Sequence, residues 1–234
     1  MQALPMSKIG LAIASIITAT MTAPMLKADI MISTEGSPNG SVAPWGTPDS
    51  GATPTYGQLF VDPAGNPILK SVEFLISNGN SSGIPFKAYV YSWNGTNITG
   101  PALFTSGTLS VAPTGSSTTF DPVDINNMNV LLTPGDEYVA LFSTVGFTGP
   151  VDSSAWDLAT QASYSSGQFE YNNSTTLPPT LSWNNLGNFG NLAFTMNFGP
   201  STPPAVPEPT SVVLLGTVVV MVWRVAHKRH SSGS

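Results

Sequence analysis

The sequence contains no cysteine, and the stretch between residues 29 and 205 also lacks arginine and histidine. Without cysteine there are no disulfide bridges, thiolate metal ligands or cysteine nucleophiles. Without histidine this stretch cannot form a Ser-His-Asp triad or a histidine-ligated zinc site. Its bases are Lys70 and Lys87, too few for the clamps that hold phosphates or nucleic acids. We therefore expect no catalytic residues and no nucleic-acid partner.

Charge is scarce and unevenly distributed. Charged residues make up 9% of the 234 residues, whereas an average soluble domain has about a quarter. The stretch 29–205 holds two lysines and 12 acidic residues, and the other five basic residues lie near the two ends of the chain. The acidic middle and the basic ends therefore have to be interpreted separately.

The first 28 residues are typical of a secretory signal peptide. Lys8 supplies the positive charge, residues 9–17 form a short apolar run, and small residues follow. We predict cleavage after Ala28. The alternative is a retained N-terminal membrane helix, for which the apolar run is short compared with the roughly 20 residues of a membrane span.

The C-terminal region combines a proline motif, an apolar segment and a basic tail. The motif consists of Val206, Pro207, Glu208 and Pro209. Residues 212–223 are apolar and predict a transmembrane helix, and clustered bases follow at Arg224, Lys228 and Arg229. By the positive-inside rule, these bases stay on the cytoplasmic side of the membrane.

This C-terminal arrangement, over residues 206–230, resembles the PEP-CTERM sorting domain, also catalogued as an ice-binding protein C-terminal domain. The family occurs on exported proteins of Gram-negative bacteria that make extracellular polysaccharide. The resemblance implies recognition by an exosortase, a membrane anchor before processing, and a final location in the cell envelope or the extracellular matrix. An ordinary single-pass anchor is the alternative. Ice binding itself would require a regular Thr-rich face, which the sequence lacks.

Between the two ends, apolar and polar residues alternate with the period of a β-strand. We predict an all-β fold, an antiparallel β-sandwich with jelly-roll-like connections, over residues 56–200. A loop-rich segment (29–55) precedes it and a Pro-rich spacer (201–205) follows it. The predicted strands are 57–61, 69–76, 86–93, 108–111, 130–132, 137–143, 168–171 and 192–198. The last of them places Leu192, Phe194, Met196 and Phe198 in the core.

Three tryptophans stand beside residues that hydrogen-bond sugar hydroxyls: Trp93, Trp156 and Trp183. Flat aromatic rings stack on the apolar faces of sugars, and neighbouring polar groups fix their orientation. Each tryptophan is therefore a candidate contact for exopolysaccharide. The competing interpretation is that these rings cap the core of the sandwich.

Acidic residues suggest one further site. The segment 121–129 concentrates hard oxygen donors, and we consider Asp121, Asp124 and Asn126 a weak candidate for calcium. No other cofactor is expected. Glu73 and Glu170 lie on predicted strands and are expected to face solvent. Our main interpretation is an exported, non-enzymatic β-sandwich protein; the alternatives are a carbohydrate-binding matrix component and an acid-pair glycosidase.

Overall fold

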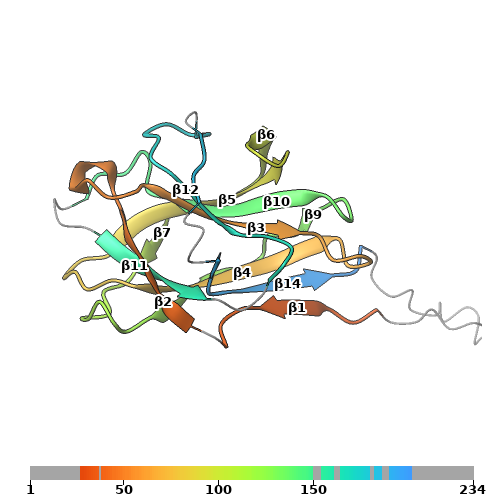
Figure 1. The fold of residues 1–234 in the computed structure, drawn as a ribbon, viewed down its shortest axis with the longest axis horizontal. Helices are drawn as coiled ribbons and strands as arrows, with labels where there is room; N and C mark the ends of the chain where they lie inside the picture. The colour runs from red at the N-terminus through yellow and green to blue at the C-terminus, as the bar shows by residue number, and fades with distance from the viewer. Residues whose placement is uncertain are drawn as a thin grey trace, which may run out of the picture. The chain divides into compact units, whose positions relative to one another are not determined.

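The computed structural model describes residues 27–36, 38–149, 154–160, 164–179, 182–185 and 190–201. These residues form two sheets that face each other, and every pairing between their strands is antiparallel (Figure 1). The predicted all-β antiparallel fold is therefore confirmed. The predicted signal helix and C-terminal transmembrane helix lie outside the described residues. Within the part of the chain that the structure describes, no helix has the length and hydrophobicity needed to cross a membrane.

One sheet has eight strands and the other has six. The eight-stranded sheet contains β1 (Ile30–Ser33), β2 (Pro38–Gly46), β4 (Ile68–Ser77), β8 (Asp121–Ile125), β9 (Val130–Leu131), β11 (Ser154–Thr160), β13 (Asn191–Leu192) and β14 (Phe194–Gly199). The six-stranded sheet contains β3 (Thr55–Val61), β5 (Ile84–Trp93), β6 (Ile98–Thr105), β7 (Leu109–Val111), β10 (Glu137–Ser143) and β12 (Phe169–Asn172). A short 3-10 helix, η1 (Pro48–Ser50), joins β2 to the segment before β3.

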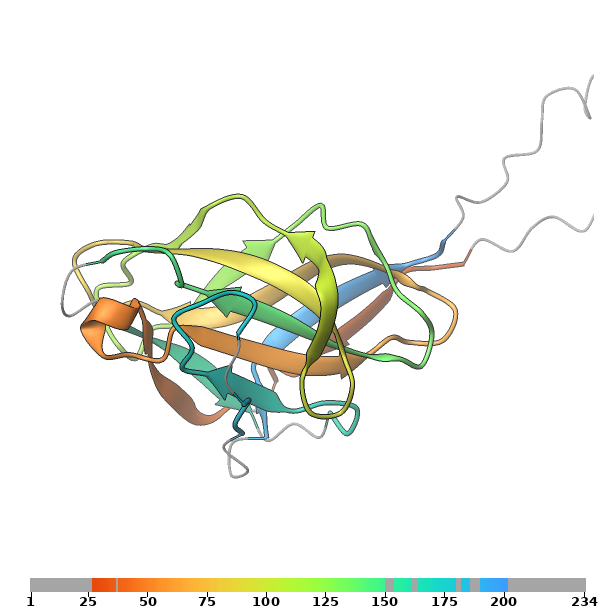
Figure 2. The same ribbon diagram turned by 90° about the horizontal axis from the view of Figure 1, so that it is seen from above.

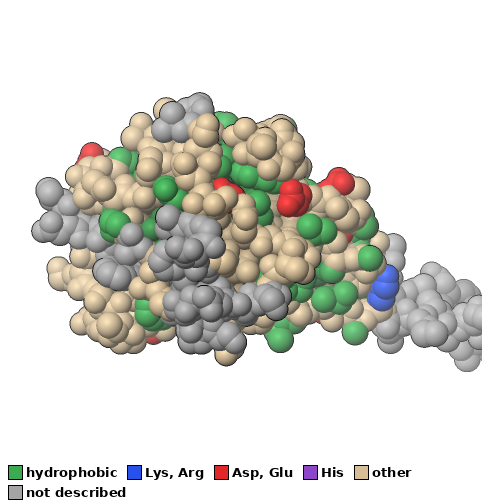
Figure 3. Space-filling model, in the orientation of Figure 1, with side chains coloured by type: hydrophobic (Ala, Val, Ile, Leu, Met, Phe, Trp, Pro, Cys, Tyr) green, Lys and Arg blue, Asp and Glu red, His purple; other side chains and the backbone are tan. Residues whose placement is uncertain are grey.

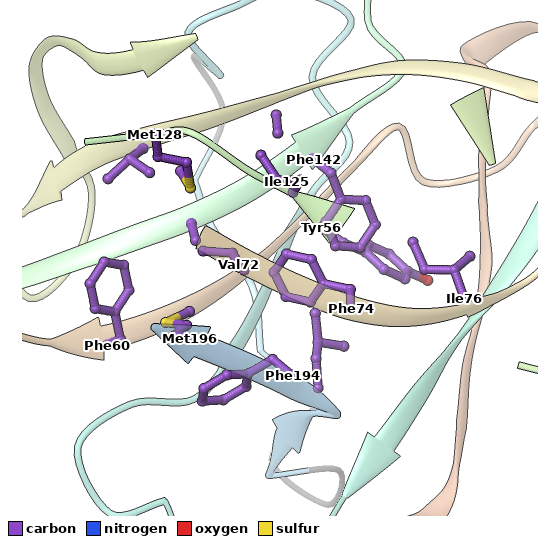
Figure 4. Packing of buried hydrophobic residues seen from close by; sticks show 14 of the residues in the cluster. Tyr56, Phe60, Val72, Phe74, Ile76, Ile125, Met128, Phe142, Phe194 and Met196 are labelled. Atoms are coloured by element: carbon purple, nitrogen blue, oxygen red, sulfur yellow. The ribbon is translucent and has the colours of Figure 1, made fainter. Parts of the chain in front are cut away.

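The core fills the space between the two sheets. Alternate residues of β4 and β14 point into it from one side, and alternate residues of β3, β5 and β10 point into it from the other (Figure 4). Phe142 of β10 lies at the centre, with its ring 4.9 Å from the rings of both Trp45 and Phe74. The four predicted core residues of the closing strand are confirmed, because each is 0% exposed.

The segment 29–55 differs from its prediction. It was expected to be loop-rich, but it contains β1 and β2 and contributes to the core. Trp45 is fully buried, and its indole N–H donates to the carbonyl of Pro54 at 3.2 Å. The prolines and glycines of β2 suggested a loop. They are accommodated because β2 pairs with β11 in an irregular register that contains bulges.

Three further strands were not predicted: β6, β8 and β11. The strand β6 follows the turn at Asn94 and pairs with β5, with a register shift along the pair. Strands β8 and β11 both pair with β4, far from them in the sequence. Few charged side chains appear on the face shown in Figure 3, in keeping with the low charge content of the chain.

Candidate functional site: an aromatic groove on the six-stranded sheet

The outer face of the six-stranded sheet carries a second apolar cluster, separate from the core. We call it the outer cluster; its buried members are Leu59, Tyr91, Trp93, Val139 and Leu141. Figure 2 looks onto this side of the molecule. Strand β5 produces the aromatic part, since alternate residues share one face of a strand. An outward face would ordinarily be polar, so this cluster needs a separate explanation.

Trp183 lies against the outer cluster. Its ring centroid is 5.7 Å from that of Trp93, and the two planes meet at 80°. Gly57 of β3 lies beside it: a Cβ there would reach ordinary contact distance of Trp183, 3.5 Å from Cζ3, but would clash with Val139, 2.8 Å from Cγ2. The adjacent residue Asn184 is held by two backbone hydrogen bonds to Tyr171 of β12, at 2.8 and 3.0 Å.

A groove opens beside the two indole rings. It has a volume of about 300 Å³, and its polar lining includes Asn97, Gln168 and Glu170. A second hollow of about 420 Å³ adjoins it and shares Trp93 and Gln168 with it. We call the two hollows together the tryptophan groove. Among the described residues that line the two hollows there is no lysine or arginine.

The turn after β5 positions one polar wall of the tryptophan groove. The side-chain oxygen of Asn94 accepts hydrogen bonds from the backbone N–H groups of Thr96 (3.1 Å) and Asn97 (2.9 Å). Gly95 has a φ of +90°, a conformation that side chains other than glycine rarely adopt. This asparagine-capped turn fixes Asn97 at the rim without using its side-chain amide in the turn.

Glu170 is buried under the groove rather than facing solvent, so that prediction is wrong. Its side chain is only 4% exposed, and Nε2 of Gln168 donates a hydrogen bond to its Oε1 at 2.6 Å. Burial raises the pKa of the Glu170 carboxyl, while hydrogen bonds from Gln168 and Asn185 lower it. The result is a polar floor whose acceptor oxygens are held in place by neighbouring amides.

The three predicted tryptophans do not form one site. Trp93 and Trp183 meet at the groove, but Trp156 belongs to β11 of the other sheet, where its backbone pairs with Ser77. Only the backbone of Trp156 is described. The sequence thus identified two residues of the groove, while Gln168 and Glu170 were missed as groove residues because neither stands beside a tryptophan in the chain.

The segment 121–129, where the sequence suggested a calcium-binding loop, begins with a strand. Residues 121–125 form β8, which pairs along β4. Because side chains alternate along a strand, Asp121 and Asp124 point to opposite faces, and both are exposed. Among the described residues, no group of three or more acidic, histidine or cysteine side chains is arranged to hold a metal.

The two strand glutamates do not form an acid pair. Glu73 lies on β4 and Glu170 on β12, in different sheets. Burial, together with the neighbouring carboxyl groups of Asp124 and Glu35, raises the pKa of Glu73 to about 7. Glycoside hydrolysis by two carboxylates needs them about 5–10 Å apart across one substrate, and this pair does not face a common groove.

The sorting motif (Val206, Pro207, Glu208, Pro209) and the topology residues (Arg224, Lys228, Arg229) lie outside the described residues. Their roles therefore stay predictions.

Comparisons with known proteins give partial structural matches and leave the function open. No family model and no curated protein sequence matches the chain. Among solved structures, clostridial Cwp84 after propeptide cleavage is 12% identical with a TM-score of 0.50, over 74% of this chain and 40% of that chain. The structure of the cysteine protease and lectin-like domains of Cwp84 from Clostridium difficile is also 12% identical, with a TM-score of 0.45, over 74% and 36% of the two chains. A family 6 carbohydrate-binding module is 18% identical with a TM-score of 0.28, over 62% and 94%.

The chain therefore spans less than half the length of the Cwp84 chains that it matches. The likeness to Cwp84 after propeptide cleavage concerns the fold alone and says nothing about activity. The class that fold and site define is an all-β protein with an aromatic groove on its smaller sheet.

Proposed function

We propose that this β-sandwich is a non-enzymatic carbohydrate-binding domain and that the tryptophan groove holds the glycan. The observation that carries the proposal is the pair Trp93 and Trp183, whose rings adjoin a groove lined with amide and hydroxyl groups. Sugar rings present apolar C–H faces and polar edges. An indole ring can stack on the C–H face, and the side chains of Asn97 and Gln168 can form hydrogen bonds with the polar edge.

The charge of the groove favours a neutral glycan. Glu137 and Glu170 line the two hollows, and the described lining contains no lysine or arginine. An acidic or phosphorylated sugar would meet negative charge without a compensating base. Since the two hollows adjoin at Trp93, a chain of several sugars fits this surface better than a single monosaccharide.

The decisive variant is Trp183→Ala. We expect it to weaken binding of a neutral polysaccharide about tenfold or more, because one stacking surface and its buried area are lost. Affinity electrophoresis against a panel of neutral and acidic polysaccharides, followed by isothermal titration calorimetry on the best ligand, measures the effect. Trp183 is preferred to Trp93, which is only 8% exposed and whose removal would also weaken the fold.

Leu131→Ala is the control for this experiment, because Leu131 is 67% exposed and lies on the other sheet. It should bind like the unaltered chain. Equal retardation of Trp183→Ala and the unaltered chain would refute the groove as the binding site. Release of reducing sugar from the bound polysaccharide would contradict the non-enzymatic part of the proposal and support the alternative that the protein is a glycosidase.

We also propose that the domain is exported and displayed at the cell envelope through the PEP-CTERM-like tail, with the jelly-roll-like connections expected for such a sandwich. The resemblance of residues 206–230 to that sorting domain supports this part. An exosortase and the membrane are then its partners, and exopolysaccharide is the ligand that the proposed location offers.

Mass spectrometry of the chain isolated from its native host tests the proposed processing. We expect a C-terminus near the motif at residues 206–209, with the apolar segment and the basic tail removed. A chain that still ends at Ser234 would contradict processing by an exosortase and leave a plain membrane anchor.

A further inference from the structure

Two buried side chains at one end of the sandwich have oxygen atoms without a hydrogen-bond partner. Asp62 follows β3 and is 2% exposed; Asn66 lies four residues later and is 1% exposed. Both carboxylate oxygens of Asp62 and the amide oxygen of Asn66 lack a partner. Buried polar atoms are nearly always paired, so three orphan acceptors within one turn call for a ligand.

The turn that carries these oxygens is well defined. The backbone N–H of Asp62 donates to the carbonyl of Asp136 at 3.3 Å, and that of Asn66 donates to the carbonyl of Pro63 at 3.3 Å. The side-chain Nδ2 of Asn66 donates to the carbonyl of Ala28 at 2.6 Å, a contact that the predicted cleavage after Ala28 would remove. By the alternation of β3, Asp62 follows Phe60 on the inward face.

Within the part of the chain that the structure describes, no base pairs with the carboxylate of Asp62. Lys27, which lies near the turn, donates to the carbonyl of Gly65 at 2.7 Å, and Lys70 pairs with Asp29 at 2.8 Å. Burial raises the pKa of Asp62 to about 6. An ionised carboxylate without a partner is strongly disfavoured in a protein interior, which means that a cation would stabilise it.

We propose that Asp62 and Asn66 form a calcium site at the turn between β3 and β4. The available donors are all hard oxygens, which Ca²⁺ prefers, and it accepts six to eight of them in irregular geometry. Two carboxylate oxygens and one amide oxygen come from side chains; main-chain carbonyls of the turn and water supply the rest. The site is separate from the tryptophan groove and from the segment 121–129, and it does not depend on the proposed glycan binding.

Calcium binding is tested on the full chain, purified in detergent and stripped with a chelator. Thermal unfolding is followed at 0, 0.1, 1 and 10 mM CaCl₂, with MgCl₂ in parallel. We expect the melting temperature to rise by about 3–10 °C at 10 mM calcium, for the millimolar or sub-millimolar affinity of extracellular calcium modules. Isothermal titration calorimetry should report one calcium per chain.

Asp62→Asn keeps the shape of the side chain and removes its charge. It should abolish the calcium response while leaving the calcium-free melting temperature equal or higher. Asp124→Asn, in the segment that the sequence suggested, should respond to calcium like the unaltered chain. No calcium in the unaltered chain, or an undiminished response in Asp62→Asn, would overturn the site. If Asp62→Asn does not fold, calorimetry on two other chains replaces it. The unaltered chain should bind calcium, and Asn66→Ala should bind calcium at least tenfold more weakly.

Discussion

Phe142→Ala is expected to lower the free energy of unfolding by about 3–5 kcal/mol. Phe142 is fully buried in β10, and its ring lies 4.9 Å from those of Trp45 and Phe74, 6.0 Å from that of Tyr56 and 6.3 Å from that of Phe86. Its neighbours come from both sheets. Truncation leaves a cavity that four rigid rings cannot fill, and the edge contacts between them are lost as well.

Urea unfolding followed by tryptophan fluorescence measures this loss. Leu131→Ala removes an aliphatic side chain that is 67% exposed, and it should stay within about 0.5 kcal/mol of the unaltered chain. A Phe142→Ala chain that unfolds at the same urea concentration as Leu131→Ala would show that the two sheets are not joined through this aromatic centre.

Gln58→Leu is expected to cost about 2–4 kcal/mol, because it leaves buried polar groups without their partner. Gln58 is fully buried on β3, and its Nε2 donates to the side-chain oxygen of Asn191 at 2.7 Å. Its Oε1 accepts from the backbone N–H of Leu192 at 2.9 Å. These bonds tie the six-stranded sheet to β13 of the other sheet, so an apolar replacement of similar size fills the space but cannot restore the link.

The same urea assay measures the effect of Gln58→Leu. Thr99→Val, a polar-to-apolar change at an exposed position of β6, should change stability by less than about 0.5 kcal/mol. Equal stability of Gln58→Leu and the unaltered chain would mean that the buried amide is dispensable and that hydrophobic packing alone holds β13 in place.

The regular strands could be predicted from the sequence, and the irregular ones could not. The strand β10 was predicted with the observed bounds, 137–143, because its residues are apolar on a strand period and a Pro-Gly-Asp turn precedes them. The strand β2 was missed because Pro, Asn and Gly dominate its local signal. It pairs with β11, more than a hundred residues later, and such a partner cannot be inferred from local propensity.

The candidate sites show the same division. Trp93 and Trp183 were both identified from their asparagine neighbours, but ninety residues separate them, and only the fold brings their rings to 5.7 Å. The proposed calcium site differs from the predicted one for a related reason. The prediction rested on the density of acidic residues at 121–129, whereas the proposal rests on Asp62, whose distinguishing property is burial without a partner.

By itself, the sequence determined the all-β class, the acidic and base-poor middle, and the exclusion of histidine, arginine and cysteine chemistry there. These follow from composition and from the two-residue period, which are local properties. The tertiary structure decided which strands pair, that Trp93 and Trp183 meet, and that Asp62 and Asn66 are buried. Burial and contact between distant residues depend on how the two sheets close over each other, and no local stretch of the sequence encodes that closure.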